Sequence, residues 1–111
     1  MNNKAYKNYE IDEYEYNELK WFCWQYDKKK RKISNTENDS EKQKLKKEIE
    51  MIDTALMLVS DSDLIISLIK KNVTQKNMPY EKLGSVPMGR RQFYEKRRKF
   101  FWILKRLRLT I

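Results

Sequence analysis

Apolar residues recur every three or four positions through most of this chain, which is the spacing of one face of an α-helix. The first such segment covers residues 5–33 and contains few residues that break helices. Its stripe, at mixed spacings, consists of Tyr9, Tyr16, Leu19, Cys23, Tyr26 and Ile33. We therefore predict one long helix over residues 5–33. The basic run at 28–32 is expected to be its solvated end, with a separate nucleic-acid contact as the alternative.

A polar segment at residues 34–40 predicts a loop, and Asp39 or Ser40 is expected to cap the helix that follows. From Glu41 onward the apolar residues follow in steps of four, three, four and three. They are Leu45, Ile49, Ile52, Leu56 and Val59. This heptad-like seam fits either an antiparallel hairpin with the first helix or a dimer with a second copy of the chain.

The second half of the chain predicts two further helices with a short helix between them. Ser60 suits the cap of a helix whose apolar face runs to about residue 74, with Asp63 three residues after the cap. Pro79 suits the start of the short helix, and Gly84 suits its left-handed end. The last helix begins after Gly89, which takes the capping position.

The order of these segments predicts an all-α fold with two regions. Residues 1–59 form an antiparallel helical hairpin, and residues 60–111 form a helix-turn-helix. Two glycines and two prolines among 111 residues are too few for a sheet protein with many turns, which agrees with this prediction.

Almost all of the net charge lies in the last helix. Residues 89–108 hold nine bases and one acid, so this segment supplies +8 of the net charge of +9. Phe93, Phe100, Leu104 and Leu107 follow one stripe and predict a buried face, so most of the bases project from the other side. A turn followed by such a helix is a common way to present cations to a phosphate backbone.

The candidate DNA-binding residues of this helix fall into two groups. In a helix-turn-helix, residues at the start of the second helix reach base edges, and later cations meet phosphates. The base-edge candidates are Arg90, Arg91, Gln92 and Tyr94. The phosphate candidates are Arg97, Arg98, Lys99 and Lys105. The alternatives are a solvated face with no partner, or an amphipathic helix that lies on an anionic membrane or an acidic protein.

Aromatic residues are concentrated near the N-terminus, where eight of the fourteen lie between Tyr6 and Tyr26. One stripe is enough for packing against the next helix, so some of these rings are surplus. The aromatic side chains outside this stripe either add to that packing or form a contact surface for another protein. The candidates for a protein contact are Tyr14, Trp21 and Trp24.

The chain has no histidine and a single cysteine, Cys23. This composition removes the usual zinc sites, haem attachment, histidine general bases and intrachain disulfides. Carboxylates such as Glu13, Glu15 and Glu18 lie on a helix surface without a histidine, a glycine-rich loop or a recognisable metal set. We therefore expect no enzyme activity, no metal and no cofactor.

The remaining composition predicts a soluble, cytoplasmic protein. A lone thiol suits a reducing cytosol, and the N-terminus lacks the apolar run of a signal peptide. The longest apolar runs, at 64–66 and 100–104, are too short to span a bilayer. We expect no membrane partner.

Four short segments in the second half carry a family resemblance. They are Ile52-Asp53-Thr54-Ala55-Leu56, Leu64-Ile65-Ile66, Tyr80-Glu81-Lys82-Leu83-Gly84 and Arg90-Arg91-Gln92-Phe93-Tyr94-Glu95-Lys96-Arg97-Arg98. In this order and spacing, residues 50–107 resemble the C-terminal region of phage late-gene transcription regulators of the ArpU and RinA type. The resemblance implies a sigma-region-4-like helix-turn-helix that binds duplex DNA.

The resemblance also implies a role and a set of partners. The implied role is sequence-specific regulation of transcription of phage late genes, with the helical hairpin used for dimerisation or for contact with RNA polymerase. Similar short proteins of phage-parasitic mobile islands imply an alternative, in which the chain binds another transcription regulator rather than DNA. The expected partners are double-stranded DNA, RNA polymerase or another regulator, and a second copy of this chain.

Overall fold

The computed structural model describes residues 10–110, and every regular element in that range is a helix. The elements are α2 (Glu13–Trp24), α3 (Tyr26–Asn35), α4 (Asp39–Val59), α5 (Asp63–Thr74), the short 3₁₀ helix η1 (Tyr80–Lys82) and α6 (Arg90–Leu109). The prediction of an all-α fold is confirmed for this range. The part of the first predicted helix at residues 5–9 lies outside the described residues.

The N-terminal segment forms two helices, and the prediction of one helix through to residue 33 is wrong. Asp12 accepts a hydrogen bond from the N–H of Glu15 at 2.8 Å, and the Glu15 carboxylate accepts one from the N–H of Asp12 at 3.1 Å. This capping box starts α2 at Glu13. At Gln25 the backbone has φ −89° and ψ 1°, and α3 begins at the next residue. The apolar stripe keeps a helical spacing on both sides of Gln25, so it gave no signal of the break.

Two further helix starts differ from the prediction by one or two residues. Asn38, not Asp39 or Ser40, caps α4, since its side-chain oxygen accepts from the N–H of Glu41 at 2.9 Å. Ser62 rather than Ser60 caps α5, and its hydroxyl accepts from the N–H of Ile65 at 3.3 Å. In each case several adjacent residues have side chains that can cap a helix, and the local backbone conformation decides which of them is the N-cap.

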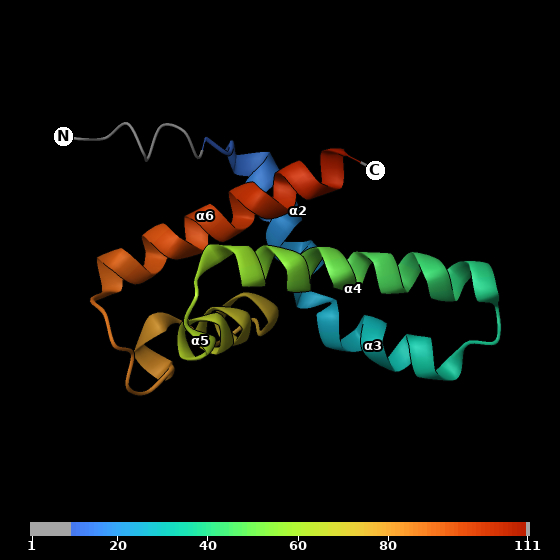
Figure 1. Ribbon diagram of the computed structural model, residues 1–111, viewed down its shortest axis with the longest axis horizontal. Helices are drawn as coiled ribbons and strands as arrows, with labels where there is room; N and C mark the ends of the chain where they lie inside the picture. The colour runs from blue at the N-terminus through green and yellow to red at the C-terminus, as the bar shows by residue number, and fades with distance from the viewer. Residues whose placement is uncertain (1–9, 111) are drawn as a thin grey trace.

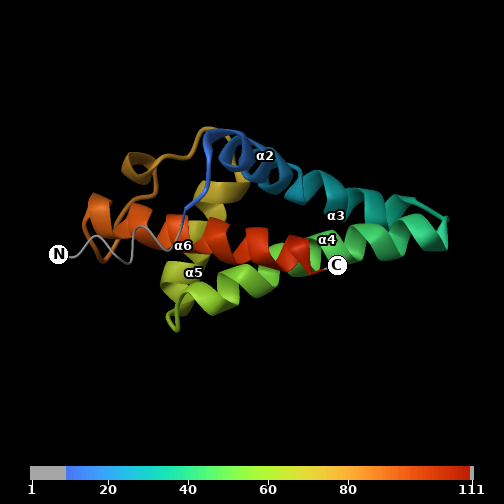
Figure 2. The same cartoon turned by 90° about the horizontal axis from the view of Figure 1, so that it is seen from above.

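The two longest helices, α4 and α6, pack against each other, and α6 runs at an angle to α4 (Figure 1). Their contact is the most extensive between helices of the described chain. α3 lies beside the first half of α4 and runs in the opposite direction, as both views show (Figure 2). α5 is seen almost along its axis in Figure 1, and α2 packs against both α5 and α6.

One continuous core joins α2, α3, α4, α5 and α6. Phe93, Phe100 and Leu104 of α6 are each 0% exposed, so the apolar stripe of the last helix faces inward as the sequence indicates. Core residues lie on both sides of the boundary expected at residues 59 and 60. The largest fully buried side chains are Tyr26, Phe93, Phe100, Phe101, Ile52, Ile69, Leu104, Val73 and Cys23.

The buried thiol of Cys23 makes the stability depend on pH in the alkaline range. Burial raises the pKa of Cys23 from an ordinary value of 9.0 to about 12. Between these values the unfolded chain loses the thiol proton and the native chain retains it. The free energy of unfolding should therefore fall by about 1.4 kcal/mol for each pH unit in this window.

Urea unfolding of the parent chain and of Cys23→Ala, followed from about pH 8 to about pH 11, measures this contribution. The variant leaves a small cavity, so we expect it to be less stable at neutral pH and to show a shallower alkaline decline. Tyr26 and Lys29 titrate in both proteins, so the difference between the two slopes reports the thiol. Parallel profiles would show that the native thiol ionises as readily as the unfolded one.

Candidate nucleic-acid interface

The start of α6 is fixed by contacts from η1. The Tyr80 hydroxyl donates to the carbonyl of Met88 at 2.7 Å, and the N–H of Tyr80 donates to the hydroxyl of Tyr94 at 3.3 Å. The ring of Tyr80 lies 5.6 Å from the ring of Phe93. These contacts join η1 to the first turn of α6, so the corner that precedes α6 is held in place before any partner binds.

Backbone and side-chain features of the connecting segment complete this corner. Gly84 follows η1 with φ 86°, a left-handed conformation that glycine adopts without strain. Asn72 of α5 donates from Nδ2 to the carbonyl of Met78 at 2.9 Å, which ties the end of α5 to the loop. Gly89 is the N-cap of α6, as the sequence predicts.

Five basic or polar residues form what we call the outward face of α6. They are Arg91, Gln92, Arg98, Lys99 and Arg106, of which Lys99 is partly buried and the others are exposed. The Arg91 side chain is 85% exposed, and its ion pair with Glu95 at 3.6 Å is a surface contact that costs little to break. This face therefore presents most of its charge to solvent, where a polyanion can reach it.

Arg90 stands at the exposed tip of α6 and is partly engaged. Its Nε donates to the Glu81 carboxylate of η1 at 2.8 Å. A hydrogen bond from the Glu81 backbone N–H, together with Arg90, lowers the pKa of that carboxylate. Both side chains are more than half exposed, so Arg90 could exchange this partner for a phosphate or a base edge.

Arg97 and Tyr94, which the sequence groups with the DNA-binding candidates, turn toward α2 and η1. The Arg97 guanidinium lies 5.5 Å from the ring of Tyr16, 5.4 Å from that of Tyr94 and 5.1 Å from that of Phe101. Its Nη1 donates to the hydroxyl of Tyr16. These contacts hold Arg97 between α2 and α6, away from the outward face.

Lys105 also faces α2. Its ammonium is 2.8 Å from the Glu15 carboxylate, and Lys105 is the main cause of the lowered pKa of Glu15. Arg108 makes a similar pair with Glu18 at 3.3 Å. The pairs fasten α6 to α2, so the structure does not bring Lys105 together with the outward face.

Arg106 is an exposed cation of α6 that our sequence-based candidates omit. It is exposed, and its guanidinium lies 5.1 Å from the ring of Trp102. Arg98 and Arg106 are eight residues apart, which places them on the same side of a helix after about two turns. That spacing was visible in the sequence and is the signal that would have identified Arg106.

The candidates for a protein contact do not share one environment. Tyr14 is 87% exposed and Trp21 is 57% exposed, so both lie on the surface of α2. Trp24 is partly buried, and its ring meets that of Trp21 edge-on at 6.5 Å. The ammonium of Lys76 lies 5.5 Å from the ring of Trp21 and 5.2 Å from that of Trp24.

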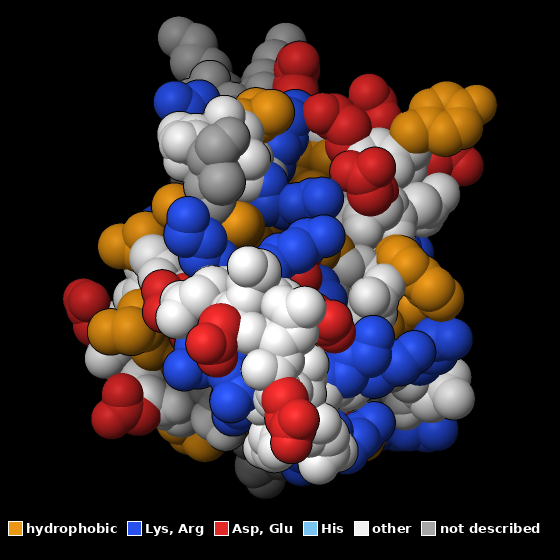
Figure 3. Space-filling model, turned by 90° about the vertical axis from the view of Figure 1, so that its right-hand side faces the viewer, with side chains coloured by type: hydrophobic (Ala, Val, Ile, Leu, Met, Phe, Trp, Pro, Cys, Tyr) orange, Lys and Arg blue, Asp and Glu red, His pale blue; other side chains and the backbone are white. Residues whose placement is uncertain are grey.

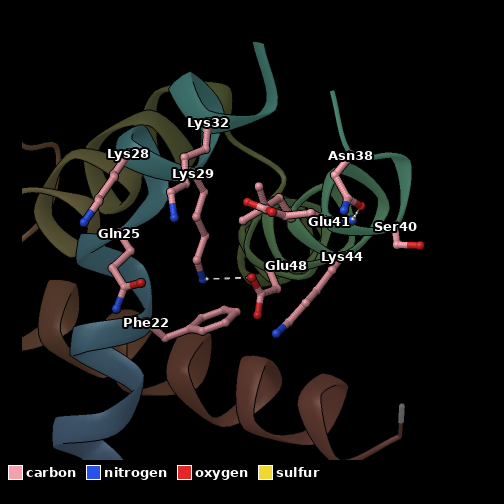
Figure 4. A pocket seen from close by; sticks show the side chains of 11 residues that line it. Phe22, Gln25, Lys28, Lys29, Lys32, Asn38, Ser40, Glu41, Lys44 and Glu48 are labelled. Atoms are coloured by element: carbon pink, nitrogen blue, oxygen red, sulfur yellow. Dashed lines mark hydrogen bonds and ion pairs between the residues drawn. The ribbon is translucent and has the colours of Figure 1, made fainter. Parts of the chain in front are cut away.

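The basic run at residues 28–32 is solvated except at one position. Lys29 is buried, reaches across the groove between α3 and α4 to Glu48 at 3.4 Å, and lies 3.8 Å from the ring of Phe22 (Figure 4). Burial lowers the pKa of Lys29, and Glu48 opposes that shift. The prediction of a fully solvated run is therefore wrong at Lys29.

The other lysines of this region contribute to a second basic surface. Lys28, Lys32 and Lys44 line the groove together with the acidic Glu41 and Glu48. Seen from the end of the molecule where α3 and α4 are joined, Lys and Arg side chains gather across the middle of the surface and along one side (Figure 3). Because acids are interspersed there, this surface offers a weaker case for binding a polyanion than α6 does.

Metal sites and membrane segments are not found in the described part of the chain. Within residues 10–110, no group of three or more carboxylate or thiol side chains is arranged to hold a metal ion. No helix in the same range combines the length and the apolar character needed to cross a bilayer.

Comparisons of this chain with protein-family models, with curated proteins and with solved structures find no match.

Proposed function

We propose that this chain binds double-stranded DNA through the outward face of α6 and thereby regulates transcription. The observation that supports this proposal most is the division of α6 into two faces. Phe93, Phe100 and Leu104 are fully buried, and Arg91 and Arg98 on the other side are exposed. A helix anchored in this way can present its cations to DNA without losing its packing.

The proposal assigns α5, η1 and α6 to a helix-turn-helix. In that motif the N-terminal residues of the second helix enter the major groove. Here those residues are Arg90, Arg91 and Gln92, which are all exposed, and η1 holds the corner behind them through Tyr80. Arg91 is best placed to donate two hydrogen bonds to a guanine edge, because neither η1 nor α2 covers it.

Three later cations of the outward face supply the phosphate contacts. Arg98, Lys99 and Arg106 extend this face beyond the first turns of α6. Arg98 and Arg106 are separated by about 12 Å along the helix axis, which is close to the width of the major groove. Contacts of this kind fix the register of the protein on the duplex, whereas base contacts give sequence preference.

The regulatory part of the proposal rests on the resemblance to phage late-gene regulators. On this view α3 and α4 contact RNA polymerase or a second copy of the chain. A second candidate function, binding to another regulator, is favoured by the exposure of Tyr14 and Trp21 on α2. A chain that binds no duplex DNA under any condition would favour this second function.

Replacing Arg91 with alanine should relax the sequence preference of DNA binding. Loss of a bidentate contact to guanine costs roughly 1–3 kcal/mol, so preference for the best duplex over a scrambled one should fall about tenfold to a hundredfold. The preferred duplex is first selected from a random library with the parent chain, and affinities are then compared by fluorescence anisotropy. Lys47→Ala removes the same charge from an exposed position on α4 and should keep the preference. An unchanged preference in Arg91→Ala would remove Arg91 from base reading.

A further inference from the structure

Another basic groove, separate from the one between α3 and α4, lies between α2, the end of α5, η1 and the inner side of α6. We call it the inner groove. Four cations line it, namely Lys20, Lys76, Lys82 and Arg97, and no described carboxylate does. It is separate from the outward face of α6, because Arg97 points toward α2.

The cations of the inner groove are not neutralised by carboxylates. Within residues 10–110, none of the four makes an ion pair, whereas Arg90, Arg91, Lys105 and Arg108 of α6 each pair with a glutamate. Residues 1–9 contain no Asp or Glu that could supply one. Four cations that surround one groove without a carboxylate partner favour an anionic occupant.

Two residues that line the inner groove each carry a buried polar atom that lacks a partner. Among the described residues, only Asn72 Oδ1 and Arg97 Nε are buried side-chain polar atoms with no hydrogen bond to protein. Both residues line this groove, and Asn72 is 7% exposed. Buried polar groups are costly to leave unpaired, so the two atoms point to a ligand that offers both an acceptor and a donor.

An aromatic surface adjoins these polar atoms. Trp24 and Tyr94 both line the inner groove. The ammonium of Lys20 lies 5.8 Å from the ring of Trp24, and that of Lys76 lies 5.2 Å from it. The two ammonium groups are thus held over the ring of Trp24, where they can bind an anion next to the aromatic wall.

We propose that the inner groove binds a nucleotide. Its phosphate accepts from Arg97 Nε and the neighbouring lysines, its base lies along Trp24 and Tyr94, and an N–H of the base donates to Asn72 Oδ1. A free mononucleotide and an unpaired nucleotide of a single strand share this chemistry. The site goes beyond duplex binding and does not depend on the outward face.

Proton–nitrogen NMR spectra of the full chain test this proposal at the two unpartnered groups. Titration with AMP should shift the Arg97 Nε–H signal and the Asn72 side-chain amide signals together and to saturation. Ribose 5-phosphate and inorganic phosphate, which lack a base, should bind more weakly and leave Asn72 unchanged. If a short single-stranded oligoadenylate binds more tightly than AMP, the ligand of the inner groove is a nucleotide within a single strand. If AMP binds more tightly than the oligoadenylate, the ligand is a free mononucleotide.

Variants at exposed positions test whether AMP binding depends on the inner groove rather than on the net charge of the chain or on the outward face of α6. Lys76→Ala should weaken AMP binding about tenfold, as expected for the loss of one charged hydrogen bond. Lys47→Ala, with the same loss of charge, and Arg91→Ala, on the outward face, should leave AMP binding unchanged. The proposal is overturned if AMP causes no saturable shift, if ribose 5-phosphate binds as tightly as AMP, or if Lys47→Ala weakens binding as much as Lys76→Ala.

Discussion

Replacing Phe100 with alanine should lower the free energy of unfolding by about 3–5 kcal/mol, which is the usual cost of removing a fully buried phenylalanine ring. Phe100 is 0% exposed and its ring lies 5.2 Å from that of Phe101, within the core that all the α-helices of the described chain share. Native domains are stable by only about 5–15 kcal/mol. The expected loss is therefore a large fraction of the total stability.

Urea unfolding followed by circular dichroism measures this loss. Leu109→Ala is the matched control, because Leu109 lies on the same helix and is 74% exposed. Its expected change is within about 0.5 kcal/mol, since surface substitutions away from packed features have small effects. Equal losses in the two variants would mean that α6 does not bury the face on which the proposed DNA contact depends.

The buried face of α6 could be predicted because its spacing is a local property of the chain. Phe93, Phe100 and Leu104 follow the helical period, and that period places them on one side of any helix they form. The corner before α6 was predictable for a similar reason. Gly84 and Gly89 suit the backbone conformations found at those two positions.

The inward turn of Arg97 and Lys105 could not be predicted from the same pattern. Both residues lie at an edge of the buried stripe of α6. Whether α2 covers that edge depends on where α2 packs. The contact from Arg97 to Tyr16 joins residues 81 positions apart. No local pattern in α6 contains that information, so the sequence could not show that these two phosphate candidates face α2.

Lys29 shows the same limit in the first half of the chain. Its neighbours Lys28 and Lys30 are exposed, and nothing in a run of bases distinguishes the one that becomes buried. Its burial follows from the position of Phe22 below its ammonium and Glu48 across the groove. The unpaired atoms of Asn72 and Arg97 are likewise visible only once α2, α5 and α6 are assembled.

Raising the salt concentration from about 50 mM to about 200 mM should weaken duplex binding by about 40-fold, because roughly three neutralised phosphates release their counterions. The cations assigned to these contacts are Arg98, Lys99 and Arg106 of the outward face. A protein partner bound through Tyr14 and Trp21 would show a much weaker dependence on salt.

The central claim, that the outward face of α6 contacts duplex phosphates, is tested most directly by the slope of log affinity against log salt concentration. For the double variant Arg98→Ala/Arg106→Ala, we expect the slope to become shallower by about 1.8, which is two phosphate contacts at about 0.9 each. For Lys46→Ala/Lys47→Ala, which removes two exposed charges from α4, we expect the slope of the parent chain. Equal slopes in the parent and in Arg98→Ala/Arg106→Ala would contradict the claim.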